Sequence, residues 1–72
     1  MDDLKRKIEL ILLWAEESER AQDMGFDASF VEKMSDKVNR LCQELTPNQI
    51  GAIENIYNKF NVEDWADESG YA

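Results

Sequence analysis

Leu45-Thr46-Pro47-Asn48-Gln49-Ile50 is the segment that decides the fold, because four helix-start signals converge in it. Thr46 is typical of an N-cap, and Pro47 suits the first helical position, where its missing N–H group is not needed. Gln49 can accept a hydrogen bond from the Thr46 amide and complete a capping box. The flanking residues Leu45 and Ile50 occupy the positions of a hydrophobic staple. The segment therefore predicts a helix that begins at Pro47.

Downstream of this box, apolar residues recur every three or four positions, which predicts a helix over residues 47–60. Asn61 then offers an end for that helix or a cap for another. Two acidic residues followed by Trp65 favour a short further helix over residues 62–68, with residues 69–72 frayed.

Upstream of the box, a second amphipathic helix is predicted over residues 28–45. Asp27 can cap it, while Ser29 with Glu32 offers a competing capping box. The sequence therefore fixes the start of this helix only to within one turn. Its apolar stripe consists of Phe30, Met34, Val38, Leu41 and Leu45, with Val31 and Cys42 at the edge. Since only Thr46 would separate this helix from the next, the two should form an almost loop-free helical hairpin.

The first helix is predicted over residues 3–23, and its apolar arc covers about half of its circumference. The arc is formed by Leu4, Ile8, Ile11, Leu12 and Ala15, extended by Leu10, Trp14 and Ala21. Leu13 falls outside it, among Glu9, Glu16 and Arg20. With no strand-like alternation, the chain is predicted to be a single all-α domain over residues 1–72, a small bundle of three main helices and a short fourth.

The composition narrows the chemistry that the chain can carry. Its 72 residues contain no histidine and one cysteine, Cys42, which excludes an intrachain disulfide or a Cys/His zinc site. We expect Cys42 to be a small core residue in a reducing cytoplasm. The short apolar run from Ile8 to Ala15 contains Glu9, so neither a signal peptide nor a membrane span is expected.

We expect no enzyme, no catalytic residue, no cofactor and no metal site. The connection that begins at Asp23 resembles the start of a calcium loop, but Ala28 and Met34 stand where that loop needs glycine and glutamate. General acid-base chemistry needs a buried carboxyl group, whereas the carboxylate pairs fall on polar faces. Cys42 has no histidine to activate it.

Two groups of cations are candidate nucleic-acid contacts. Lys33, Lys37 and Arg40 recur at helical spacing and predict a ridge that could follow a phosphate backbone; the alternative is a solvated face neutralised by Asp36 and Glu44. Lys5, Arg6 and Lys7 form the second group, which Asp2 and Asp3 could neutralise. The net charge of −8 opposes long-range attraction to DNA, so any such contact must be local.

The surplus apolar surface of the first helix is the candidate partner interface, with Leu10, Leu13 and Trp14 as its anchors. The alternative is that Trp14 packs against Trp65 or Tyr57, since a small core needs every aromatic residue. The sequence leaves both interpretations open.

The run from F26-x-x-S-F to L45-T-P-N-Q-I-G-A-I-E-N-I-Y-N-K-F60 resembles segments of phage and bacterial DNA-processing proteins. From MDDLKRKIELILLWAEE onward, the chain resembles the small proteins encoded beside the UvsW superfamily 2 helicase in T4-type phages. The resemblance implies a helical bundle similar to the accessory nucleic-acid-binding module of RecQ-type helicases. It also implies a role near recombination, repair and replication, in the host cytoplasm. It transfers no functional residue and implies no helicase activity, because the chain has no P-loop.

Two functional hypotheses follow. In the first, the protein is a non-catalytic accessory module that docks on a helicase or binds branched or single-stranded nucleic acid weakly. In the second, it is an acidic module that binds proteins only, as a phage modulator of a basic, nucleic-acid-binding partner.

Overall fold

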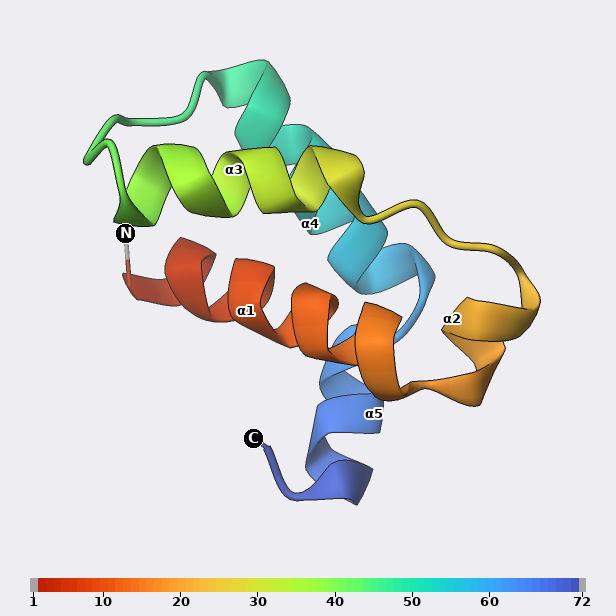
Figure 1. The fold of residues 1–72 in the computed structure, drawn as a ribbon. Coiled ribbons are helices and arrows are strands. Elements are labelled where there is room, and N and C mark those ends of the chain that lie inside the picture. The colour runs from red at the N-terminus through yellow and green to blue at the C-terminus, as the bar shows by residue number, and fades with distance from the viewer. Residues whose placement is uncertain (1, 72) are drawn as a thin grey trace.

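The computed structural model describes residues 2–71, without the side chain of Asp2, and all of its regular elements are helices. The helices are α1 (Asp2–Glu17), α2 (Glu19–Asp23), α3 (Ser29–Asn39), α4 (Pro47–Lys59) and α5 (Val62–Ser69) (Figure 1). The prediction of a small all-α bundle is confirmed. Five helices replace the expected four.

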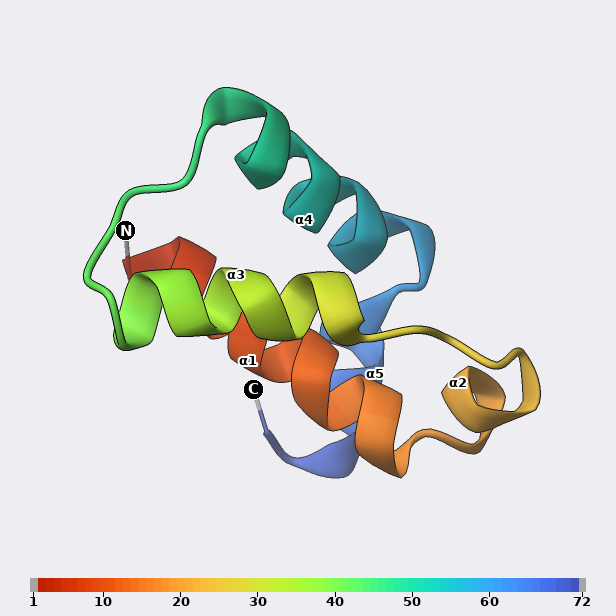
Figure 2. The ribbon, with the colours of Figure 1, turned by 45° about the horizontal axis from the view of Figure 1, so that its top comes forward.

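The helix α1 is the centre of the fold, since it packs against each of the other four. α3 lies alongside α1 and runs in the opposite direction, whereas α4 diverges from α3 (Figure 1, Figure 2). The core is contributed mainly by α1, with Ile8, Ile11 and Trp14 almost fully buried, and by Val31 of α3 and Ile53 of α4. The apolar arc of α1 is wide because it serves several neighbours.

Ser18 interrupts the helix that was predicted over residues 3–23. Its backbone is extended, with φ −77° and ψ 124°, and α2 begins at the following residue. The interruption redirects the chain so that Ala21 is buried, 1% exposed, and Phe26 reaches the ring of Trp14. Helical periodicity continues through Ser18 in the sequence and therefore hid this break.

The helix α3 ends at Asn39, so the prediction of a helix to Leu45 and of an almost loop-free hairpin is wrong. The amides of Leu41 and Gln43 donate back to the carbonyls of Asp36 and Lys37, and Cys42 takes a left-handed conformation with φ 53°. These bonds close the end of the helix and turn the chain into a loop.

That loop redistributes the apolar residues expected on α3. Leu45 lies in the loop and is buried in the core, whereas Leu41 is 56% exposed and Cys42 is also exposed. The expectation that Cys42 is a core residue is therefore wrong. Phe30, placed in the same apolar stripe, is 37% exposed. Within α3, only Val31, Met34 and Val38 are buried.

The capping box at the start of α4 is confirmed. The Gln49 amide donates to Thr46 Oγ1 over 3.2 Å, and the Thr46 amide donates to Gln49 Oε1 over 2.9 Å. Lys37 Nζ of α3 also donates to Gln49 Oε1, over 3.2 Å. The cap therefore connects α4 to α3 across the loop.

The helix α5 is followed by a turn. Gly70 closes α5 in the left-handed region with φ 83°, and the Tyr71 ring stacks on Trp65 with ring centroids 5.4 Å apart. The Tyr71 hydroxyl donates to Glu17 Oε2 over 2.5 Å. Fraying was predicted from residue 69, but residues 69–71 return to the end of α1; Ala72 lies outside the described residues.

Trp14 is the centre of an aromatic cluster. It stacks on Phe60 at a centroid distance of 5.0 Å and meets Phe26 edge-on at 4.9 Å. The core interpretation of Trp14 is therefore the correct one, although its aromatic partners are Phe26 and Phe60 instead of Trp65 and Tyr57. The break at Ser18 and the end of α4 bring these partners together.

Candidate functional site

An open hollow of about 380 Å³ lies on the outer side of α1, where α3 runs beside it. The floor is apolar because Leu12 and Leu13 are half-buried and pack against the core from outside. Its rim is acidic and consists of Glu9, Glu16 and Glu32, all exposed. We call these five residues the acidic groove.

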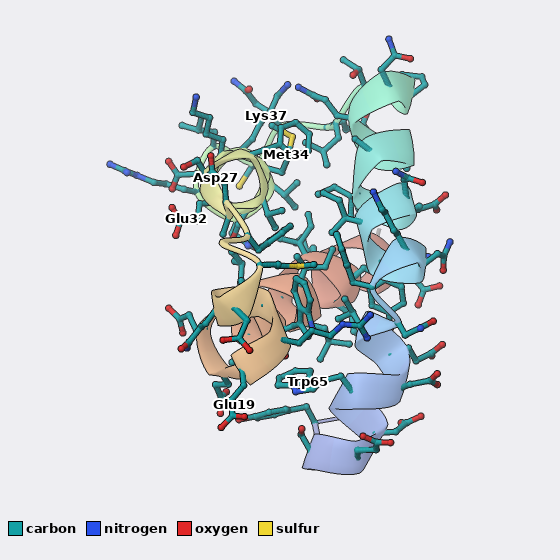
Figure 3. All side chains as sticks on the ribbon, turned by 90° about the vertical axis from the view of Figure 1, so that its right-hand side faces the viewer. Glu19, Asp27, Glu32, Met34, Lys37 and Trp65 are labelled. Atoms are coloured by element: carbon teal, nitrogen blue, oxygen red, sulfur yellow. The ribbon has the colours of Figure 1, made fainter. Side chains whose placement is uncertain are left out.

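Helical geometry explains how the acidic groove forms. Glu9 and Glu16 are seven residues apart on α1, which places them on one face with an axial separation of about 10.5 Å. Leu12 and Leu13 lie between them on the same face. Glu32 comes from α3, which antiparallel packing brings to the opposite rim. Figure 3 shows Glu32 and Lys37 on different sides of α3.

Of the three residues that were expected to form a partner interface, two lie in the core and one lies at the surface. Leu10 is 4% exposed and Trp14 is 2% exposed, so both belong to the core and neither is available to a partner. Their side of α1 is covered by other elements, as the stack of Trp14 on Phe60 illustrates. Only Leu13 faces solvent, as part of the acidic groove.

Two of the three cations in the predicted ridge on α3 contact other side chains of the protein. Lys37 donates to Gln49, and Arg40 Nη1 lies 3.7 Å from Asp36 Oδ2. Arg40 also lies beyond the last turn of α3. Lys33 is exposed and, among the described residues, forms no ion pair. The ridge is therefore shorter than its sequence spacing suggested.

The cations at the start of α1 point in different directions. Lys7 Nζ lies 3.7 Å from Glu54 Oε1 and 5.6 Å from the centroid of the Tyr57 ring, both on α4. Asp2 and Asp3 were expected to neutralise this group; the Asp2 side chain lies outside the description, and the described partner of Lys7 is Glu54. Arg6 is exposed.

Lys5 helps to line a hollow with residues at the end of α3 and in the following loop: Val38, Cys42, Gln43 and Glu44. The start of α1 therefore lies beside the end of α3, and the two candidate cationic groups share one end of the molecule. Residues 2–8 and 33–44 together hold six of the eight cations and four of the sixteen acidic residues, so they sum to +2, whereas the rest of the chain sums to −10.

The sequence missed the acidic groove because its rim comes from two helices. In the sequence, Leu13 was recognised as an outlier among Glu9, Glu16 and Arg20, whereas Leu12 was assigned to the apolar arc that faces the core. The sequence did not indicate that Glu32 belongs to the same surface, because its position at the rim depends on how α3 packs against α1.

Among the side chains of residues 3–71, no group of three carboxylates or cysteines lies close enough together to hold a metal ion. None of the helices in this part of the chain has the length and apolar character that crossing a membrane requires. Compared with protein-family models, curated proteins and solved structures, the chain matches none of them.

Proposed function

We propose that the protein is a non-catalytic accessory module that docks on a protein of DNA recombination, repair or replication, such as a helicase. The observation that carries this proposal is the acidic groove, in which solvent-facing Leu12 and Leu13 are ringed by three carboxylates from two helices. An apolar floor with a polar rim is the usual anatomy of a protein interface.

The identity of the partner rests on two arguments. The resemblance to small phage proteins encoded beside a superfamily 2 helicase favours DNA processing in the cytoplasm of an infected host. The strong negative charge outside the end formed by residues 2–8 and 33–44 favours a basic partner, a property common to proteins that bind nucleic acid.

The test is binding of a purified superfamily 2 helicase of the UvsW type to the immobilised protein, with Leu13→Asp as the disrupting variant. A buried carboxylate in the interface should weaken binding by at least about tenfold. Leu41→Asp is the matched control, because Leu41 is also exposed but lies in the loop after α3. Equal binding by the wild type and Leu13→Asp, or no binding of the helicase at all, would contradict the proposal.

The second candidate function is weak contact with branched or single-stranded nucleic acid at the cationic end. The placement of Lys5 beside the end of α3 favours it, because that end also carries Lys37 and Arg40. Phosphate contacts of this kind are local and sensitive to salt.

Fluorescence anisotropy with labelled branched and single-stranded DNA tests this candidate. Lys33→Glu is the cleaner variant, since Lys37 also supports the cap of α4. Binding at low salt that Lys33→Glu weakens is the expected result. An unchanged signal at low salt and tens of micromolar protein would exclude the candidate and leave protein docking unaffected.

A further inference from the structure

We infer that the acidic groove receives a basic amphipathic helix of the partner protein. An aliphatic side chain of that helix enters the hollow over Leu12 and Leu13, and two cations seven residues apart lie beside Glu9 and Glu16. A third cation meets Glu32 on the α3 side. This inference rests on the proposed docking function and specifies the chemistry of the docking segment.

The spacing of the carboxylates supports a helical occupant. Glu9 and Glu16 are two helical turns apart, about 10.5 Å along α1, and a second helix lying along α1 repeats the same distance between its own residues i and i+7. Residues i+3 and i+4 of that helix lie between its two cations, directly over the apolar floor. A pattern of cation, two central aliphatic residues and cation on one helix face is therefore complementary to the groove.

The negative charge of the groove favours a positively charged occupant. The rim carries three exposed carboxylates, while the protein as a whole carries −8. Phosphate backbones, anionic lipid surfaces and a second copy of this chain would all meet repulsion there. Lys5 precedes Glu9 by one turn on the same side of α1, which disfavours a cation of the partner beyond the Glu9 end. The first cation of the partner is thus expected beside Glu9 and not nearer the start of α1.

The shape of the groove favours a side chain presented by a helix over a small molecule. The hollow is open, and its floor is made of two aliphatic side chains that retain contact with solvent. Small-molecule sites enclose most of the ligand surface, whereas this groove would cover one side only. No strand occurs in residues 2–71, so an extended peptide has no sheet edge to join.

The probe is a fluorescent, alanine-rich peptide of about 20 residues, long enough to sample the helix. It carries two lysines seven residues apart, with leucines three and four positions after the first lysine. One control peptide replaces the lysines by glutamates, and another replaces the leucines by serines. The expected result is saturable binding of the probe at low salt, and at least about tenfold weaker binding of each control peptide.

Matched variants of the protein test whether the probe peptide binds at the acidic groove. Simultaneous substitution of Glu9, Glu16 and Glu32 by glutamine should weaken binding by about tenfold and reduce its dependence on salt. The control variant replaces the exposed residues Glu19, Glu44 and Glu68 by glutamine, which changes the net charge equally at sites outside the groove. It should bind the probe within about twofold of the wild type.

Several outcomes would overturn the inference: no probe binding at about 1 mM peptide, equal binding of the glutamate peptide, equal weakening by the two triple variants, or self-association of the protein through the groove. If the helicase binds in a Leu13-dependent manner but the probe does not bind, the helical occupant is wrong while the proposed function stands. If the probe binds and the helicase does not, the groove chemistry stands and the partner is wrong.

Discussion

Tyr57 of α4 is buried, and its hydroxyl makes no hydrogen bond of good geometry to a described residue, although the Arg6 guanidinium group lies near it. The ammonium group of Lys7 lies over its ring. Burial, with a smaller contribution from the Glu63 carboxylate, raises the pKa of Tyr57 above its ordinary value of 10.0. A buried hydroxyl without a partner stabilises nothing and has lost its hydration.

Tyr57→Phe is therefore expected to leave the free energy of unfolding unchanged or to raise it by about 1 kcal/mol at neutral pH. Urea melts measure this effect. Tyr71→Phe is the contrasting variant, since it removes the hydroxyl that donates to Glu17 and should not stabilise. A clear loss of stability in Tyr57→Phe would mean that its hydroxyl has a partner.

Tyr57→Phe should also change how the free energy of unfolding depends on pH in the alkaline range. Because the pKa of Tyr57 is raised in the folded protein, ionisation of the phenol favours the unfolded chain, and this effect is absent below the unfolded pKa near 10. The wild type therefore loses stability as pH rises from there through the folded pKa. Tyr57→Phe should therefore lose less stability than the wild type between about pH 9 and pH 11.

At the scale of single elements, α4 depends on its capping box. Thr46→Ala should lower the free energy of unfolding by about 1 kcal/mol, because the Gln49 amide loses its acceptor. Thr46→Ser keeps the hydroxyl and should lose much less. Urea melts of the two variants check the expectation, and equal stability of Thr46→Ala and the wild type would contradict it.

The contrast between α4 and α3 explains what the sequence could reveal. The start of α4 depends on groups within four residues of Thr46, so the local pattern was sufficient. The end of α3 is closed by backbone bonds from Leu41 and Gln43 and by the left-handed Cys42, which helical periodicity does not reveal. Leu41 and Cys42 continue the helical period in the sequence, yet the chain leaves the helix before them. Periodicity records which residues could face a core, but not how far that core extends.

The acidic groove was predictable in the same partial way. Leu13 was identified from its position on α1, whereas Leu10 and Trp14 were named with it although the structure buries both. An apolar excess on one helix does not distinguish several internal neighbours from one external partner. The contribution of Glu32 required the packing of α3 on α1.

At the scale of the molecule, the net charge of −8 predicts that repulsion between like charges destabilises the fold. The described residues contain two ion pairs, in a chain of net charge −8. Raising potassium chloride from about 20 mM to about 200 mM should therefore increase the urea midpoint, because screening weakens the repulsion more than it weakens two pairs. A midpoint that falls with salt would show that ion pairs contribute more than this distribution implies.

Because α1 contacts every other helix, its inner face holds the fold together while its outer face carries the acidic groove. The groove exists only when α3 is docked on α1, so the unfolded chain cannot offer it. Any occupant must therefore shift the folding equilibrium by mass action, at about 2.7 kcal/mol for a concentration one hundred times its dissociation constant. Co-expression with the true partner should accordingly slow turnover of this small protein in cells, even though the partner touches only one helix face and its neighbour.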